Sequence, residues 1–178
     1  MARKGQLAQL AYEMKTVLED GIETTGAVCV DGAPAYGGVD ATEDFDSLTI
    51  YALDCGDGEA DDFIEQMPNI AFKGDRTPIE YLLDDNVIYQ SNFTFEIRMP
   101  FHHTKTINGT VHEYSELASW YLERLQYVLD LWTPTSVMCA GKLNSGSMSP
   151  GQVDEESDIV YTAQTFFTIM YKGEGASQ

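Results

Sequence analysis

Apolar residues recur at three- and four-residue steps in two segments, which predicts two amphipathic helices. The first covers residues 7–18 and is expected to end near Gly21. The second covers residues 110–132, where Thr110 and Glu113 can form a capping box. Its apolar positions form one stripe along the helix: Leu117, Trp120, Tyr121, Leu125, Val128 and Trp132.

Strict alternation of apolar and polar residues predicts the clearest strand, at residues 92–99. Phe93, Phe95 and Ile97 alternate there with polar side chains, so that one face is apolar. Apolar runs rich in β-branched and aromatic residues predict further strands. These runs are residues 27–30, 47–53, 137–140 and 159–172. By contrast, residues 144–157 have the Gly, Ser and Pro content of a loop.

The order of these elements predicts one α+β domain over residues 1–178. We expect a mixed, largely antiparallel sheet with two helices packed on one face. Residues 56–90 lack clear periodicity and are expected to form a long irregular insertion, an extended loop or arm. Residues 173–178 are expected to form a flexible tail. The candidate core residues are Phe93, Phe95, Ile97, Leu117, Trp120, Leu125, Phe167 and Ile169.

Charge changes this picture more than composition does. The chain of 178 residues has 43% hydrophobic residues, enough for a conventional core, but a formal net charge of −19. Such a charge argues against binding nucleic acid through its phosphates and against docking on anionic membranes. No Lys or Arg occurs between Asp31 and Phe72, although this segment holds many Asp and Glu residues. These carboxylates could bind metal, mimic nucleic acid or repel a negatively charged molecule.

Residues of the types that carry chemistry do not occur in the required patterns. Residues 54–59 place acids near glycines, but without the alternating ligands of an EF-hand loop. His102 and His103 are adjacent and would point to opposite sides of a strand, which makes a poor chelating pair. We therefore expect no catalytic, metal or cofactor site, and a protein that is not an enzyme.

The cysteines and the first residues bear on the compartment. Three cysteines, Cys29, Cys55 and Cys139, are odd in number and isolated, which favours free thiols in a reducing environment. Residues 7–18 are interrupted by charged and polar side chains, unlike a secretion signal. No apolar run approaches transmembrane length. We expect a protein made in a cytoplasm and without membrane contact.

Five segments that follow the first helix occur in a familiar order. They are TTGAVCVDGAPA (24–35), DFDSLTIYAL (44–53), FTFEIRMPFH (93–102), ELASWYLERLQYVL (116–129) and DEESDIVYTAQTFFTIMYKG (154–173). Together they resemble the tail-terminator proteins of lambda-type long-tailed bacteriophages, also called minor tail or minor capsid proteins. The resemblance covers about residues 6–173, and it departs from compact family members in the longer segment 56–90.

The resemblance implies a virion protein that is assembled in the host cytoplasm. It would form a homo-oligomeric ring, of six copies, on the head-proximal end of the tail tube. The ring would end polymerisation of the tail-tube protein and offer the surface that a neck or connector protein joins. We expect the strands Phe93–Met99 and Ile159–Tyr171 to offer sheet edges for ring contacts.

In such a ring DNA would pass through without specific binding. A negative bore would repel the DNA, and the candidate lumen-facing acids are Asp40, Glu43, Asp44 and Asp46. The simpler interpretation is that these acids keep the monomer soluble. Two alternatives stay open for the whole protein: another phage structural subunit, such as a tail-tube or head-completion (neck) protein, or an acidic DNA-mimic inhibitor.

Overall fold

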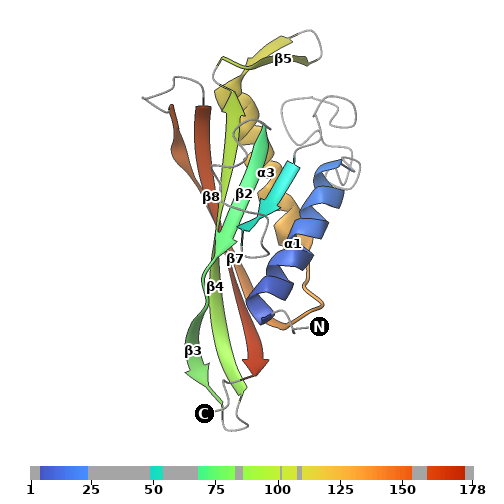
Figure 1. The fold of residues 1–178 in the computed structure, drawn as a ribbon, viewed down its shortest axis with the longest axis vertical. Coiled ribbons are helices and arrows are strands. Elements are labelled where there is room, and N and C mark those ends of the chain that lie inside the picture. Colours follow the sequence, from blue (N-terminus) through green and yellow to red (C-terminus); the bar gives the residue numbers. More distant parts are fainter. Residues whose placement is uncertain are drawn as a thin grey trace.

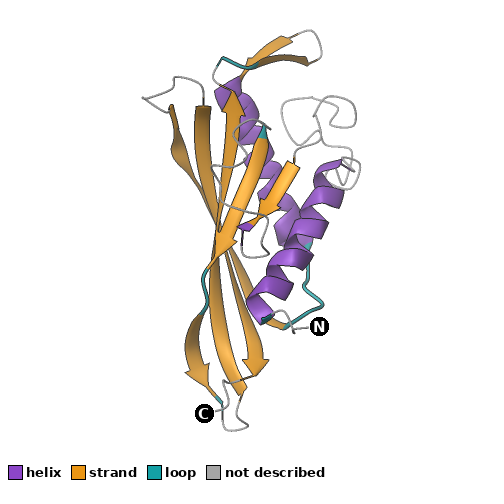
Figure 2. Ribbon diagram, viewed as in Figure 1, coloured by secondary structure: helices purple, strands orange, loops and turns teal. Residues whose placement is uncertain are grey.

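The part of the chain that the structure describes forms a two-layer α+β architecture of one main sheet and two helices, with a separate two-stranded hairpin (Figure 1, Figure 2). It is a computed structural model. The described residues are 5–23, 49–53, 68–82, 86–100, 102–107, 110–153 and 160–174.

The main sheet has the strand order β1-β2-β4-β8-β7, and β3 also pairs with β4. β1 and β2 are parallel, whereas the other pairs are antiparallel, so the sheet is mixed and largely antiparallel, as predicted. The strands are β1 (Thr49–Ala52), β2 (Asn69–Gly74), β3 (Thr77–Tyr81), β4 (Asn86–Pro100), β7 (Met138–Val153) and β8 (Val160–Glu174).

The pairing of β4 with β8 runs through the centre of this sheet. All of β4 is in register with β8, from Asn86 opposite Glu174 to Pro100 opposite Val160. Alternate residues of β4 are buried, as the sequence pattern predicts. Phe95 is fully buried and its ring stacks on Phe72 of β2, with centroids 4.8 Å apart.

Both helices lie on the same side of the sheet (Figure 1). α1 (Gln6–Glu23) packs on β1 and β2, and α3 (Tyr114–Leu131) packs on β4, β7 and β8, while the two helices also contact each other. The candidate core residues with described side chains are all buried: Phe93, Phe95, Ile97, Leu117, Leu125, Phe167 and Ile169. The side chain of Trp120 lies outside the described residues.

The prediction that Phe93–Met99 and Ile159–Tyr171 offer sheet edges is wrong. The described residues of these segments belong to β4 and β8, and each of the two strands is paired on both sides. Within the described part of the chain, the strands at the edges of the sheet are β1, β3 and β7. β3 carries Pro78, which has no N–H to donate to a further strand, and β7 has three register shifts against β8.

The expectation of an irregular insertion over residues 56–90 does not hold for its second part. β2 lies inside the sheet, and its residues Asn69–Phe72 are buried. β3 follows after Asp75, whose carboxylate accepts hydrogen bonds from the backbone and side-chain nitrogens of Asn92, at 3.1 and 3.0 Å. Residues 54–67 and 83–85 lie outside the described residues.

Two further boundaries differ from the prediction. The capping box at Thr110 and Glu113 is wrong, because Thr110–Glu113 is β6, which pairs with β5 (Thr104–Ile107) in a separate hairpin. The helix begins at Tyr114 without a side-chain cap. The loop expected from residue 144 is also wrong, since β7 continues to Val153 and pairs with β8 across its register shifts.

Candidate functional site

The structure leaves the predicted lumen-facing acids unplaced. Asp40, Glu43, Asp44 and Asp46 all lie outside the described residues. The expected flexible tail at 173–178 starts too early, because Gly173 still pairs with Val87 in the sheet. The candidate surfaces that the structure does describe involve other residues.

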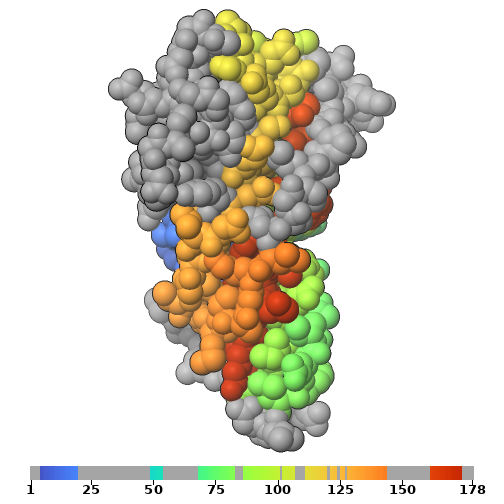
Figure 3. Space-filling model, turned by 180° about the vertical axis from the view of Figure 1, so that it is seen from behind, coloured from blue at the N-terminus to red at the C-terminus, as the bar shows by residue number. Residues whose placement is uncertain are grey.

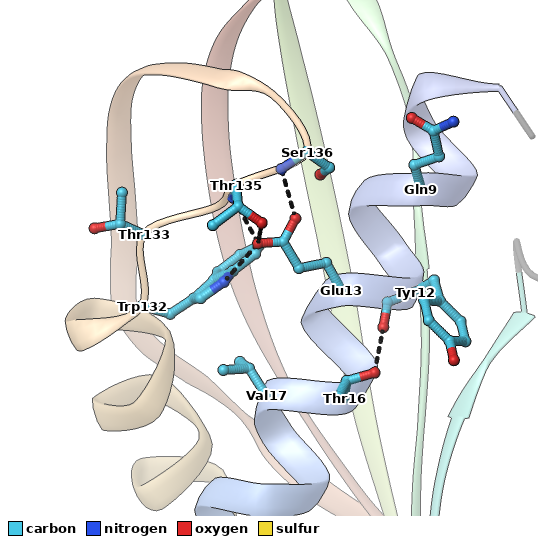
Figure 4. Close-up of a pocket in the computed structure, with 9 residues that line it drawn as sticks. All are labelled: Gln9, Tyr12, Glu13, Thr16, Val17, Trp132, Thr133, Thr135 and Ser136. Carbon is cyan, nitrogen blue, oxygen red and sulfur yellow. Dashed lines mark hydrogen bonds between the residues drawn. The ribbon is translucent and has the colours of Figure 1, made fainter.

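A groove of about 590 Å³ lies between α1 and the connection from α3 to β7 (Figure 4). Tyr12, Val17 and Trp132 supply most of its apolar lining. Glu13 projects from α1 toward the connection, and its carboxylate is almost surrounded by donors. It accepts hydrogen bonds from Trp132 Nε1 (3.3 Å), Thr135 N (2.6 Å), Thr135 Oγ1 (3.1 Å) and Ser136 N (2.9 Å).

These donors determine the charge state of Glu13. Partial burial raises the pKa of the carboxyl group, but the hydrogen bonds from Ser136 and Thr135 outweigh it, so that the pKa of Glu13 is lowered from its ordinary value. A carboxylate that is held in this way is ionised, and its oxygens already accept hydrogen bonds from the protein. Glu13 therefore acts as a clamp between α1 and the α3–β7 connection, not as a general base.

Lys142 of β7 closes the end of α3 in a similar way. Its ammonium group donates to the carbonyl oxygens of Leu129 (3.1 Å), Asp130 (2.7 Å) and Trp132. The last carbonyls of a helix have no partners within the helix, and a cation there also interacts favourably with the helix dipole. The one lysine thus ties α3 to an edge strand.

Replacing Lys142 by Met should lower the free energy of unfolding by about 1–2 kcal/mol, because the charged donor is lost while the aliphatic stem is kept. Chemical denaturation would measure the change. Lys73, an exposed lysine of β2, supplies the control: Lys73→Met should change stability by less than about 0.5 kcal/mol. Equal effects of the two variants would contradict the capping role.

The sheet face that the helices leave uncovered, called the open face below, carries a polar ladder over its central strands. Asn92 Oδ1 accepts hydrogen bonds from Gln90 Nε2 (3.0 Å) and Thr168 Oγ1 (2.9 Å). Four residues further along β4 on the same face, Glu96 accepts from Arg98 Nη2 and from Gln164 Nε2, both at 2.7 Å. The ladder joins β4 to β8 and satisfies its own polar groups.

Toward β7 the open face becomes apolar. Leu143 lies opposite Thr168 of β8, and Met138 lies opposite Lys172, so these side chains share the face of Thr168 and Phe166. Leu143 is 63% exposed, Met138 70% and Phe166 38%. Figure 3 shows the start of β7 (orange) beside β8 (red) and the green strands β4 and β3.

The histidines are distributed around the β5–β6 hairpin. His102 has a left-handed backbone (φ 64°) in the turn after β4, and its ring lies edge-on to Tyr114 at 6.2 Å. His112 was expected in the first helical turn; it lies in β6 instead, with Nδ1 2.9 Å from Glu116 Oε2. Among the described residues, no three His, Cys, Asp or Glu side chains gather as a metal site would require.

Neither of the described helices is long and apolar enough to cross a membrane. No protein-family model matches the sequence, and no curated protein matches it either.

The surfaces described above were only partly accessible to sequence reasoning. Glu13 gave no signal, because its partners lie more than 100 residues away along the chain. The apolar part of the open face gave little signal, because residues 144–157 have the composition of a loop and not that of a strand. The hairpin did have a signal: Asn108 and Gly109, between Ile107 and Thr110, are the pair most typical of tight hairpin turns.

Proposed function

We propose that this chain is a virion structural protein that caps the head-proximal end of a bacteriophage tail tube as a ring. The observation that carries the proposal is the order of elements on which the family resemblance rests. In the described residues α1, β1, β4, α3 and β8 follow one another in that order and belong to one two-layer domain.

A cap of this kind works through surfaces. A tail tube is a heterologous assembly of stacked rings, which does not close by itself. The terminating ring must present one face that fits the last tube ring and another that does not accept more tube protein. A neck or connector protein would then join that second face.

Charge distribution supports this role over that of a DNA mimic. A mimic needs carboxylates arrayed along a surface like duplex phosphates, whereas β7 and the described part of β8 contain Glu174 as their one acidic residue. The proposal that Asp40, Glu43, Asp44 and Asp46 line a DNA-repelling bore stays a prediction.

Electron microscopy of tails tests the proposal. Tails assembled with the protein should show one additional ring at the head-proximal end, and tails assembled without it should be longer and variable in length. Gold-labelled protein should localise to that end alone. Label along the tube or at the distal tip would contradict the proposal, and so would normal tail length in the absence of the protein.

A further inference from the structure

Acidic residues are distributed very unevenly along this chain. The sequence holds 29 Asp and Glu residues, yet none lies between Leu131 and Val153 or between Ile159 and Gly173. These two segments contain β7 and almost all of β8, which pair with each other. Lys142 and Lys172 are their charged residues. In a protein of net charge −19, β7 and β8 therefore contain a single acidic residue, Glu174 at the end of β8.

The same two strands, β7 and β8, carry exposed apolar side chains that adjoin one another. On the open face, Leu143 lies beside Thr168, and Phe166 is the next residue of β8 on that face. Met138 lies beside Lys172 at the other end, with the half-buried Met170 between. Single exposed apolar residues are ordinary, but a contiguous group of them is typical of a contact site.

The helix side of the molecule has the opposite character. Glu116, Glu123 and Asp130 follow one another along α3 at intervals of about two turns, so they share one stripe. Glu116 and Asp130 are exposed and Glu123 is half-buried, which directs the stripe away from the sheet. The domain thus has an acidic stripe along α3 on its helix side and an apolar open face at β7 and β8, two strands with Glu174 as their one acidic residue.

We propose that the open face of β7 and β8, centred on Leu143 and Phe166, docks on the acidic helix side of a second copy of this chain. Charge selects this occupant and this orientation. Contact between two helix sides would place their carboxylates against one another, and these like charges would repel. Contact between two open faces would bury the same patch twice and would stop at a dimer. Contact of the open face with the helix side places Lys172 and uncharged residues next to the acidic stripe of the second copy. Such a contact uses two different surfaces, so it can repeat from copy to copy until a ring closes.

The edge strands of the sheet are poorly suited to pairing with a strand of another copy, which favours contact through the faces of the domain. Continuous pairing between copies would need regular free edges, but Pro78 interrupts β3 and three register shifts interrupt β7. β1 is only four residues long. Packing of faces does not depend on these edges.

Leu143→Glu tests the contact directly, and Val111→Glu is its matched control. Both residues are exposed apolar side chains, 63% and 62% accessible, and both lie in strands, but Val111 belongs to the β5–β6 hairpin. Each variant adds one negative charge, and thermal melting would establish that both are folded. Sedimentation velocity of the full chain over a range of concentrations, near physiological ionic strength, would measure self-association.

We expect the wild-type protein to form species larger than a dimer as concentration rises. Leu143→Glu should weaken this association by about tenfold or more, because a buried contact then receives an unpaired charge, and Val111→Glu should leave it within about twofold. Met138→Glu, at the 70% exposed end of the patch, should act like Leu143→Glu. A wild-type protein that stays monomeric at about 1 mM would overturn the proposal, as would equal effects of Leu143→Glu and Val111→Glu, or association that stops at a dimer.

This inference rests on the proposed ring function, but the two can fail separately. Association that Leu143→Glu disrupts, with no ring on tails, would retain the contact and reject the tail role. A ring on tails that contains Leu143→Glu protein as readily as wild-type protein would retain the tail role and reject the contact.

Discussion

Replacing Phe95 by Ala is expected to lower the free energy of unfolding by about 3–5 kcal/mol. Phe95 is fully buried in β4, and its ring stacks on Phe72. Truncation removes apolar area from the core and leaves a cavity between the sheet and the helices, which close packing prevents from collapsing fully. Urea denaturation followed by fluorescence would measure the change.

Phe166→Ala is the matched control for this prediction. Phe166 lies in β8 opposite Thr94 of β4, one residue from the position of Phe95, but on the open face and 38% exposed. Its removal should cost less than about 1.5 kcal/mol, because part of its surface already faces water. If Phe166→Ala destabilised the protein as much as Phe95→Ala, the assignment of the core to the helix side of the sheet would be wrong.

Replacing Glu13 by Gln is expected to lower the free energy of unfolding at pH 7 by about 1.5–3 kcal/mol, the range for lost hydrogen bonds to a charged group. The amide keeps the shape of the carboxylate but offers one acceptor oxygen in place of two. The backbone N–H groups of Thr135 and Ser136, which now donate to Glu13 at 2.6 and 2.9 Å, would compete for that oxygen. Thermal and chemical denaturation at pH 7 would measure the loss.

The same pair of proteins should differ in its response to acid. Because the pKa of Glu13 is lower in the folded chain than in the unfolded chain, its ionised form stabilises the fold. This contribution is fully present above the ordinary Glu pKa, about 4.3, and is lost as pH falls through the lower folded value. The stability of wild-type protein and Glu13→Gln should therefore converge as pH falls below the ordinary Glu pKa and through the lower folded value. A difference that stays constant down to acid pH would contradict the clamp.

The elements with a strong period were predictable from the sequence. The alternation in β4 and the apolar stripe of α3 each report burial on one side, and the structure buries those side chains. The two helices on one face of a mixed sheet followed from the order of such elements. Local pattern suffices where one face of an element meets the core and the other meets water.

The missed strands owe their structure to their neighbours. β7 contains Gly141, Gly146 and Pro150 and has the composition of a loop, yet it pairs with β8 by shifting register around its irregular positions. β2 is too short to show a period, and Pro68 before it and Gly74 at its end are residue types that favour a break. A strand of this kind is specified by the partner beside it, which a local pattern does not contain.

The candidate surface was predictable in one respect only. The acid-free segments around β7 and β8 are visible in the sequence. That they lie side by side, and that Leu143 and Phe166 share a face opposite the helices, depends on the register of two strands. The Glu13 clamp depends on tertiary placement alone, since its partners Thr135 and Ser136 are distant in sequence.

The central pairing of β4 with β8 also has a consequence for synthesis on the ribosome. Residues such as Asn92 and Thr168 are 76 positions apart, and Glu13 is 122 positions from Thr135. Translation at about 5–20 residues per second therefore leaves β4 without its central partner for several seconds. During that time its apolar face is open to chaperones and to other nascent chains. Contacts of such long range also slow folding. Co-expression of a chaperone that binds exposed apolar strands should therefore raise the yield of folded protein.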